Sequence, residues 1–470
     1  MKIEQIYTGC LAEAAYYIES NGEAAIVDPL REVEPYIEMA KERGATIKYV
    51  LETHFHADFV SGHLDLAKKS GAKIVYGPTA KANFDAYLAT DGEELALGDI
   101  TIKVLHTPGH TMESSSFLLL DETGKEHSVY TGDTLFIGDV GRPDLAVKTD
   151  LTQEDLAGHL FESLRKKLMP LPDDVIVYPG HGQGSACGKN MSSETVDTLG
   201  NQKRTNYALR ADMSKEEFIK EVTTGLVAPP QYFPKNAVMN KMGYSSFDDV
   251  LSKGMTFMDV ARFKEAMKQE NAIIIDTRHH SKFTLGFIPG SIFIGIDDNF
   301  APWMGVLIED LDAPVLMIAD EGREEEVITR MARVGYDNPV GFLKGGLRAW
   351  VADGNEVDSM GNLAPEDFAR QYATENPKVL DVRKASEYDS HHLEGAENFP
   401  LDFIYQNLNK LDKEGKYIVH CAGGYRSVAA ASNMKKFGVK DVTNVLGGFN
   451  KMKEIEGLPL SSFHTQTSML

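Results

Sequence analysis

An internal repeat in the second half of this 470-residue chain constrains its fold more than any other feature. Each copy has an apolar strand that ends in Asp, then a second apolar strand, a helix and a double glycine. The first copy contains I-I-I-D-T-R from residue 273 and a double glycine at 345–346, and the second contains V-L-D-V-R from residue 379 and a double glycine at 447–448. From the Asp to the first of these glycines the spacing is 69 residues in one copy and 66 in the other. Strands that alternate with helices in this way predict two small α/β domains of about 100 residues each.

The first half of the chain also alternates short apolar strands with helices and turn signals. Strands are expected at residues 24–27, 47–51, 73–76, 100–105, 116–120, 128–130 and 175–178, and helices at 35–43 and 62–69. This pattern predicts a layered α/β structure with polar loops at the strand ends. Together with the repeat it predicts three domains, at residues 1–250, 251–358 and 359–470, of which the first ends in a helical tail.

Composition disfavours several partners and compartments. The chain has 48 basic and 70 acidic residues, a net charge of −22, which argues against binding to nucleic acid or to an anionic membrane. No apolar run approaches the about 20 residues of a membrane span, and the N-terminus lacks the pattern of a signal peptide. The three cysteines are too few and too scattered for a disulfide framework, as is usual in a reducing cytosol. We therefore expect a cytoplasmic protein with neither a membrane nor a nucleic-acid partner.

The segment T-H-F-H-A-D-F-V-S-G-H, at residues 53–63, follows a predicted strand and carries three possible metal ligands within five positions. Three further loops with glycine and a ligand side chain occur at other strand ends. The possible ligands in these four segments are His54, His56, Asp58, His110, Asp133 and His181. Loops at strand ends meet at the rim of a sheet, so this recurrence predicts a metal site. We interpret the nearby His63 and His106 as structural.

Spacing alone allows two kinds of metal site. Three imidazoles, from His54, His56 and His110, would suit zinc. Two imidazoles and a carboxylate, from His54, His110 and Asp133, would leave open positions and suit non-haem Fe(II) and O2 chemistry. The chemistry of the residues does not choose between these alternatives.

Cys421 lies between a predicted strand and a predicted helix, in the segment C-A-G-G-Y-R-S. A cysteine at this place faces backbone N–H groups and the positive end of the helix dipole, and the two glycines let the loop curl around the sulfur. These conditions favour a thiolate or a bound persulfide, so we predict a reactive thiol. Arg426 either adds positive charge or holds the loop through a carboxylate partner. The predicted persulfide-binding residues of the loop are Ala422, Gly423, Gly424, Tyr425 and Ser427.

The other copy of the repeat differs at this place. Aligning the two copies puts Asp320 over Cys421, and glutamates at 324–326 follow where a helix N-terminus would receive an anionic sulfur. Without a nucleophile this copy is predicted to be inactive, and to serve as a packing spacer or an oligomer contact. Of the other cysteines, Cys10 is interpreted as core. Cys187, six residues after His181, is either a buried structural thiol or a thiol that handles persulfide near the metal.

The four ligand segments, read as H-x-H-x-D, P-G-H-T, G-D-T and G-H-G, resemble the metallo-β-lactamase superfamily over residues 1–210. The resemblance implies an αββα sandwich with the metal site at one edge. Two-metal members have a further His where this chain has Phe59, which indicates one metal. The segment G-D-V-G-R-P-D at 138–144 is similar to the persulfide dioxygenase branch, in which iron is held by the counterparts of His54, His110 and Asp133. The residues then expected around the metal or the substrate are His56, Asp58, His181, Arg142 and Cys187.

The C-x-x-x-x-R loop at Cys421, with D-V-R upstream at 381–383, resembles rhodanese sulfurtransferases over residues 360–458. Phosphatases of related architecture use a loop one residue longer, because they must enclose a phosphate. The shorter loop indicates sulfur transfer, with Cys421 and Arg426 as the catalytic residues.

The order of the three parts resembles the fused persulfide dioxygenase–sulfurtransferases of bacteria, with an α/β fold of one αββα sandwich and two small rhodanese-like domains. This resemblance implies one Fe(II) per chain and oxidation by O2 of a glutathione, cysteine or coenzyme A persulfide to sulfite, to which Cys421 adds sulfur to give thiosulfate. We expect a homo-oligomer, a dimer or a tetramer. The alternatives are a zinc thioester hydrolase of glyoxalase II type with persulfide-binding rhodanese modules, a persulfide sensor, and a metal-dependent nuclease, which the negative charge disfavours.

Overall fold

The computed structural model describes residues 1–147, 151–226, 228–269, 271–297 and 299–464. The chain divides into two compact units. The first consists of Met1–Phe247 with Ala332–Gly335, and the second of Asp248–Met331 with the described residues from Tyr336 on. Among the described helices, none is both long enough and apolar enough to cross a bilayer.

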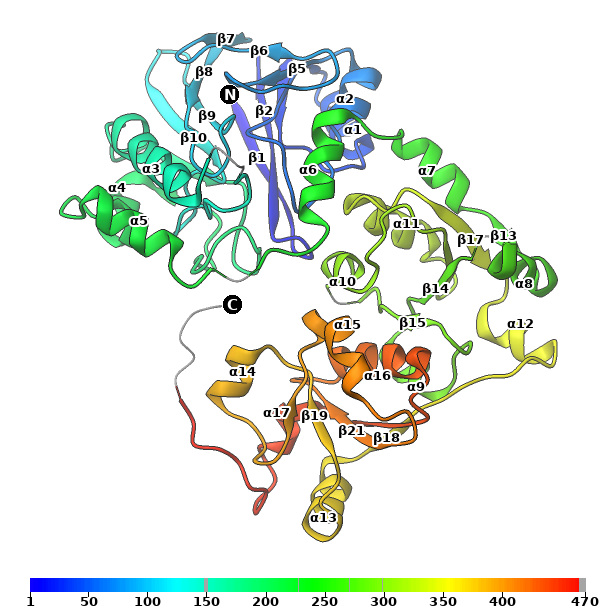
Figure 1. Cartoon of the computed structure of the whole chain (residues 1–470). Coiled ribbons are helices and arrows are strands. Elements are labelled where there is room, and N and C mark those ends of the chain that lie inside the picture. The colour runs from blue at the N-terminus through cyan, green and yellow to red at the C-terminus, as the bar shows by residue number, and fades with distance from the viewer. Residues whose placement is uncertain (148–150, 227, 270, 298, 465–470) are drawn as a thin grey trace. The chain divides into compact units, whose positions relative to one another are not determined.

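The first unit contains two six-stranded mixed sheets (Figure 1). The first sheet has the order β1 (Lys2–Thr8), β2 (Glu13–Ser20), β3 (Glu23–Val27), β4 (Thr46–Leu51), β5 (Lys73–Tyr76) and β6 (Tyr87–Leu88). The second sheet has the order β12 (Asp197–Thr198), β11 (Ile176–Pro179), β10 (Glu126–Gly132), β9 (Ser115–Leu120), β8 (Ile100–His106) and β7 (Glu94–Leu97). Strands β3 to β6 are parallel to one another, as are β10 and β11, and the other neighbours are antiparallel.

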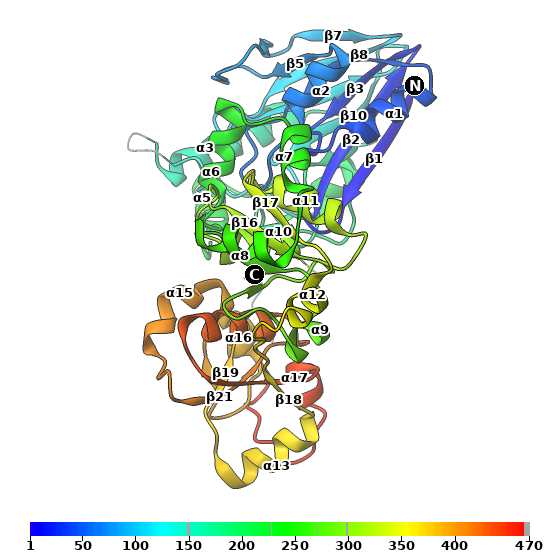
Figure 2. The same ribbon diagram turned by 90° about the vertical axis from the view of Figure 1, so that its right-hand side faces the viewer.

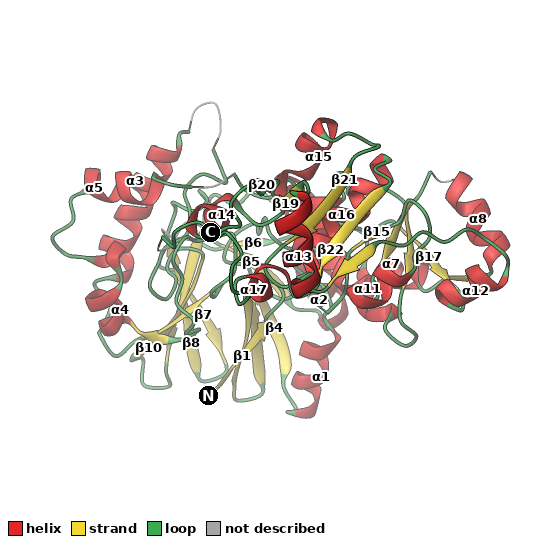
Figure 3. Cartoon of the chain, turned by 90° about the horizontal axis from the view of Figure 1, so that it is seen from below, coloured by secondary structure: helices red, strands yellow, loops and turns green. Residues whose placement is uncertain are grey.

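Helices cover the outer faces of these two sheets (Figure 3). They are α1 (Glu34–Glu42) and α2 (His63–Ser70) on the first sheet, and α3 (Gln153–Ser163), α4 (Leu199–Thr205) and α5 (Lys215–Thr223) on the second, followed by α6 (Phe233–Met242). All eight residues of β2 are buried because both of its faces are covered. Tyr16 and Ile18 pack between the sheets, whereas Ala15 and Tyr17 pack toward the helices. The layers confirm the predicted αββα sandwich.

Strand ends bring the candidate ligands to one edge of this sandwich. His54 follows β4, Asp133 follows β10 and His181 follows β11, while His110 lies in the loop after β8. Strands β8, β10 and β11 run in the same direction, so the loops that follow them leave the second sheet at the same edge.

The second unit contains two five-stranded sheets in which every neighbouring pair is parallel. The sheet of the middle copy has the order β13 (Phe257–Met258), β17 (Pro339–Leu343), β16 (Val315–Ile318), β14 (Ile273–Asp276) and β15 (Ile292–Phe293). That of the C-terminal copy has the order β18 (Gly361–Leu363), β22 (Asp441–Val445), β21 (Lys416–His420), β19 (Val379–Asp381) and β20 (Glu397–Asn398). The orders correspond strand for strand, which confirms the internal repeat, while the predicted domain boundaries stay predictions.

Helices pack against both faces of each parallel sheet. The middle copy has α7 (Phe247–Gly254), α8 (Val260–Gln269), α9 (His280–Leu285), α10 (Phe300–Leu307), α11 (Glu324–Arg333) and α12 (Gly346–Ala352). The C-terminal copy has α13 (Pro365–Glu375), α14 (Ala385–Ser390), α15 (Ile404–Asn407), α16 (Tyr425–Phe437) and α17 (Gly448–Met452). Figure 2 shows α16 on one side of β19 and β21 and α13 on the other. Parallel sheets need this double cover, because their strands are apolar on both faces.

Candidate metal centre and reactive cysteine

Three of the predicted ligands, His54, His110 and Asp133, are brought together in the first unit. One ligand atom from each lies within 4.8 Å of the others, and all three side chains are buried. Asp133 Oδ2 is 3.4 Å from His110 Nε2 and 3.9 Å from His54 Nε2. The structure therefore contains the set of two imidazoles and one carboxylate.

Neighbouring oxygens decide which nitrogen each of these histidines presents. His54 Nδ1 lies 2.9 Å from the hydroxyl of Thr53, which itself donates to Asp28, so His54 is the donor. His110 Nδ1 donates to the carbonyl of Arg142 at 2.9 Å. These bonds select, for each neutral ring, the tautomer with its proton on Nδ1, in which Nε2 faces the carboxylate with the free lone pair that a metal ligand requires.

Electrostatics at this centre favours a bound cation. Burial lowers the pKa of His54 well below its ordinary value, and the neighbouring His56 and His110 lower it further, so its imidazole is neutral. Both carboxylate oxygens of Asp133 are buried and lack a hydrogen-bond partner among the described residues. An unpaired buried carboxylate is costly, and a metal ion would remove this cost. The residues present therefore fit a metal ion.

A second group of donors lies on the other side of Asp133. His181 Nε2 is 3.5 Å from Asp133 Oδ1 and 3.4 Å from Asp58 Oδ2, and its Nδ1 faces the carbonyl of Ala12 at 3.2 Å. The buried Cys187 thiol belongs to the same cluster, with its sulfur within 4.8 Å of ligand atoms of Asp133 and His181. Burial raises the pKa of this thiol well above its usual value, as do the nearby Asp58 and Asp133. The thiol is therefore protonated near neutral pH.

His56 lies in a different environment, although it is only two residues from His54. Its Nε2 is 3.1 Å from Asp28 and 3.8 Å from Glu52, and its ring centroid is 4.4 Å from that of Phe59. Burial alone would lower the pKa of His56, but these carboxylates raise it to about 10. The ring is thus held between carboxylates, and one of its nitrogens also lies within 4.8 Å of ligand atoms of Asp58 and His181.

Two carboxylates of this network, Asp28 and Glu52, were not among the predicted site residues. Asp28 directly follows β3 and accepts from both the backbone N–H and the hydroxyl of Thr53. Glu52 directly follows β4 and accepts from Ser61. Their position immediately after apolar strands is the signal in the sequence that could have found them.

The segment at 138–144 supports the metal centre through its backbone. Arg142 accepts from His110 and its N–H donates to the carbonyl of Cys187, while its guanidinium binds Asp144 and the carbonyl of Ala186. A Cβ at Gly141 would lie 1.9 Å from the carbonyl oxygen of Asp133, so only glycine fits there. The structure therefore places Arg142 as an orienting residue.

In the C-terminal copy, the Cys421 loop (residues 421–427) curls around a buried sulfur. The N–H of Gly424 donates to Cys421 Sγ at 3.0 Å, and the Ser427 hydroxyl lies 3.5 Å from it. Gly424 precedes the first residue of α16 and has a φ of 115°, which favours glycine. The helix N-terminus and a backbone N–H therefore meet the sulfur, as predicted.

An ion pair holds the Cys421 loop to α14. Arg426 donates to both carboxylate oxygens of Glu387, at 2.5 and 2.9 Å. Burial would raise the pKa of Glu387, but the bond to Arg426 brings it below its ordinary value. The sequence allowed Arg426 either to add positive charge or to pair with a carboxylate, and the structure shows the pairing.

The double glycine clamps the loop from the other side. The N–H of Phe449 donates to the carbonyl of Cys421 at 2.7 Å, and that of Asn450 to the carbonyl of Ala422 at 3.0 Å. A Cβ at Gly448 would lie 2.3 Å from the first of these carbonyl oxygens. The glycine allows α17 to approach and fixes the peptide planes of the loop.

Strand register corrects the alignment of the two copies. Asp381 pairs with His420 and Asp276 pairs with Ile318, so the residue that corresponds to Cys421 is Ala319 and not Asp320. The glycines that follow these positions, Gly322 and Gly424, both have a positive φ and stand at the same distance in sequence from Ala319 and Cys421. The alignment of residue types had matched one polar residue with another, whereas hydrogen bonding between strands fixes the true equivalence. The middle copy still lacks a nucleophile.

The loop of the middle copy that corresponds to the Cys421 loop carries an ion pair. Lys282, which corresponds to Glu387, donates to both oxygens of Asp320 at 2.8 Å. The first turn of α11 carries three glutamates, at 324–326, as expected. The positive charge of Lys282, which could attract an anionic sulfur, is therefore already neutralised by Asp320 in this copy.

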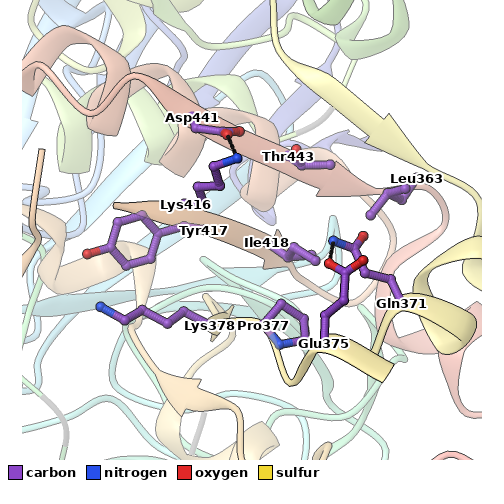
Figure 4. A pocket seen from close by; sticks show the side chains of 10 residues that line it. All are labelled: Leu363, Gln371, Glu375, Pro377, Lys378, Lys416, Tyr417, Ile418, Asp441 and Thr443. Carbon is purple, nitrogen blue, oxygen red and sulfur yellow. Dashed lines mark hydrogen bonds and ion pairs between the residues drawn. The ribbon is translucent and has the colours of Figure 1, made fainter. Parts of the chain in front are cut away.

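A pocket of about 410 Å³ lies at the opposite end of the C-terminal sheet from Cys421 (Figure 4). It is lined by Leu363, Gln371, Glu375, Pro377, Lys378, Lys416, Tyr417, Ile418, Asp441 and Thr443. Lys416 pairs with Asp441 at 3.7 Å, and Lys378 lies over the ring of Tyr417. Its charges are balanced internally, and Cys421 follows the other end of β21, so we assign this pocket no part in the chemistry.

The sandwich with its histidine and carboxylate centre, followed by two parallel sheets of one topology, defines a metallo-β-lactamase-fold protein with rhodanese-like domains. The chain belongs to the metallo-beta-lactamase superfamily. The model of that superfamily matches residues 8–181, and the model of the rhodanese-like domain matches residues 259–353 and 364–455.

Two kinds of relative, hydroxyacylglutathione hydrolases and persulfide dioxygenases, match the chain at about the same sequence identity. A probable hydroxyacylglutathione hydrolase of Schizosaccharomyces pombe is 32% identical over 203 residues, which cover 41% of this chain and 75% of that protein. The mitochondrial persulfide dioxygenase ETHE1 of Homo sapiens is 31% identical over 201 residues, which cover 42% of this chain and 70% of that protein. The crystal structure of a metallo-beta-lactamase from Staphylococcus aureus is 32% identical, with a TM-score of 0.64, and covers 73% of this chain and 98% of that chain.

Proposed function

We propose that this protein is an Fe(II)-dependent persulfide dioxygenase whose C-terminal copy transfers sulfur to sulfite. The observation that carries the proposal is the buried set of His54, His110 and Asp133, which has the ligand types that suit non-haem iron. The Cys421 loop adds a second site for sulfur chemistry in the same chain, and one group of relatives consists of persulfide dioxygenases.

In the first unit, His54 and His110 would hold one iron through Nε2, and Asp133 through its carboxylate. Iron bound there would supply the activation of O2 that a persulfide cannot achieve alone. Asp58 and His181 lie on the far side of Asp133 and are placed to hydrogen-bond the substrate or a water molecule. Cys187 is protonated, which supports a neutral thiol packed beside this group.

The first reaction balances as a four-electron oxidation of sulfur. A persulfide, O2 and water give the free thiol and sulfurous acid, which ionises to sulfite. The sulfur–sulfur bond of the persulfide breaks, the terminal sulfur loses four electrons, and O2 is the oxidant.

The second reaction uses Cys421. Its thiolate takes the terminal sulfur of another persulfide, whose sulfur–sulfur bond breaks to release the thiol. Sulfite then attacks this bound sulfur, the electron pair of the breaking bond returns to Cys421 Sγ, and thiosulfate leaves. The N–H of Gly424, which donates to Sγ, and the N-terminus of α16 stabilise the negative charge at each stage.

The predicted partners follow from this chemistry. Substrates are the persulfides of glutathione, cysteine or coenzyme A, with O2 and sulfite. A cytoplasmic location, a dimer or tetramer, and the lack of nucleic-acid and membrane partners stay predictions. Joining the sites in one chain would shorten the path of sulfite to Cys421.

Product analysis tests the proposal. With glutathione persulfide, the parent protein is expected to form thiosulfate, Cys421→Ser to form sulfite at an unchanged rate of O2 uptake, and His110→Ala to form neither. Cys10→Ser serves as the matched control, since it makes the same exchange at another free cysteine and leaves Cys421 and the metal ligands in place. Thiosulfate formation by Cys421→Ser at the parent rate would contradict the sulfur-transfer half, and persulfide oxidation by His110→Ala would contradict the metal half.

A thioester hydrolase of glyoxalase II type is the second candidate. It is favoured by the hydroxyacylglutathione hydrolases among the relatives and by Asp58 and His181, which add donors for a second metal ion. It predicts zinc in the purified protein and hydrolysis of S-lactoylglutathione without O2 uptake.

A further inference from the structure

The helix that follows the Cys421 loop is held by the middle copy. β15 is the edge strand of the middle sheet, and its outer side is covered by α16 rather than by another strand. The backbone N–H of Phe293, in β15, donates to Ser432 Oγ of α16 at 3.0 Å. The edge strand of a sheet leaves backbone donors and acceptors unpaired, and α16 pairs one of these donors, which attaches the helix to the sheet.

Tyr425, the first residue of α16, contacts the middle copy through both its hydroxyl and its ring. Its hydroxyl donates to the carbonyl of Gly295 at 3.0 Å, and its ring centroid is 5.2 Å from that of Phe293. Gly295 has no room for a side chain, because a Cβ there would lie 2.7 Å from Phe293 Cζ and 3.1 Å from Tyr425 Cε2. Tyr425 of the loop is thus held by a hydrogen bond, by ring packing and by the close approach of Gly295.

A second attachment holds the same helix further along. The hydroxyl of Tyr405 lies 2.5 Å from the carbonyl of Leu307 in the middle copy and 2.9 Å from Asn433 Oδ1 on α16. Lys435, also on α16, pairs at 2.9 Å with Asp358, which lies between the two copies. Contacts along α16 therefore resist its rotation as well as its displacement.

We propose that the middle copy is a positioning element for the Cys421 loop and that Tyr425 is the positioning residue through which it acts. Gly424, whose N–H donates to Cys421 Sγ, directly precedes Tyr425, so any shift of Tyr425 moves that donor. In the middle copy the residue that corresponds to Tyr425 is Arg323, which binds Asp297 and Glu326 of its own copy. A copy without a nucleophile is retained because it holds the loop of the copy that has one.

Two variants and two readouts test this proposal. The first readout does not depend on the proposed function, whereas the second rests on the proposed sulfur transfer. Gly295→Ala puts a methyl group against the rings of Phe293 and Tyr425 and so pushes Tyr425 away from the middle copy, whereas Tyr425→Phe removes only the hydroxyl bond. The first readout is the rate of alkylation of Cys421 by iodoacetamide, followed by mass spectrometry of its peptide. The second is kcat and KM for thiosulfate formation from glutathione persulfide and sulfite.

Gly295→Ala is expected to lower both the alkylation rate and kcat by about tenfold, and Tyr425→Phe by a smaller factor. KM is expected to change less than kcat, because the displaced group, the N–H of Gly424, acts on the sulfur nucleophile. Lys264→Ala, the matched control, breaks the ion pair with Asp353 beside β13 and β17, toward the opposite edge of the middle sheet from β15, and is expected to keep both parent rates.

Parent rates for both Gly295→Ala and Tyr425→Phe would overturn the proposal. If Gly295→Ala fails to fold, Tyr425→Phe keeps the ring contacts and decides by the same criterion. A parent protein that forms no thiosulfate through Cys421 would refute the proposed function, while the alkylation rates would still decide the positioning role.

Discussion

At the residue scale, neighbours rather than residue type determine what each histidine of the metal centre can do. His54 and His56 are two residues apart and both are buried. The hydroxyl of Thr53 accepts a hydrogen bond from Nδ1 of His54, whereas Asp28 lies against Nε2 of His56 and favours the protonated form of that ring. One ring is therefore neutral and suited to bind a metal, and the other is held in its cationic form, a difference that the spacing of the histidines does not reveal.

Phe59 gives a direct test of metal number. Its fully buried ring lies against His56, which together with Asp58 and His181 forms a second group of possible ligands. Phe59→His is expected to raise the bound metal from about one to about two ions per chain, because it adds an imidazole to Asp58 and His181. Phe59→Leu, without a ligand atom, is the control. Metal analysis by mass spectrometry decides, and equal metal content in the two variants would contradict the prediction.

Gly448 and Gly346 form a matched pair in the two copies. They share nearly the same φ, 54° and 57°, so alanine is equally strained at both. Only at Gly448 would the new methyl group meet the loop, whereas at Gly346 the nearest atom is 3.9 Å away. Gly448→Ala is expected to cost about 1–3 kcal/mol more stability than Gly346→Ala, as overpacking does.

Urea unfolding of both variants, together with their rates of thiosulfate formation, measures this difference. Equal losses of stability and activity would show that the double glycine does not clamp the Cys421 loop.

At the element scale, an ion pair between α14 and the Cys421 loop makes the stability of the C-terminal copy depend on pH. The pKa of Glu387 is held below its ordinary value of 4.5 by Arg426. A group whose pKa is lower in the folded state stabilises the fold above its unfolded pKa and ceases to do so as pH falls through the folded value. The pair should therefore stabilise at neutral pH and lose its effect below pH 4.5.

Glu387→Gln is expected to lower the free energy of unfolding by about 1–3 kcal/mol at pH 7, because it removes a charged hydrogen-bond partner of Arg426. This difference from the parent should narrow as the pH falls below 4.5. Urea unfolding at several pH values measures it, with the exposed Glu366→Gln as control. A difference that stays constant down to pH 3 would refute the assignment.

The elements themselves show what a sequence pattern can and cannot provide. Strands β3, β4, β5 and β8 were predicted within a residue or two, since their apolar runs are bounded by turn signals. β2 was not predicted, because it is buried on both faces and has no alternation to detect. The Cys421 loop was predicted from its own residues, whereas its partner Glu387 and the equivalence with Ala319 depend on contacts between distant segments.

At the scale of the whole molecule, the chain joins a metallo-β-lactamase-fold sandwich with a group of possible metal ligands to two rhodanese-like copies, of which the middle one bonds to the helix that follows the Cys421 loop. The predicted αββα sandwich and the two small α/β domains are confirmed. The identity of the metal could not be predicted from residue types, because histidine and carboxylate bind both zinc and iron. The relatives, which include hydrolases and dioxygenases, leave the same choice.

Oxygen consumption with glutathione persulfide, measured on protein loaded with iron and on protein loaded with zinc, tests the central claim most directly. The iron-loaded protein should consume one O2 for each persulfide oxidised to sulfite, and the zinc-loaded protein should consume none. Absence of O2 uptake by the iron-loaded protein, with hydrolysis of S-lactoylglutathione by the zinc-loaded protein, would contradict the account.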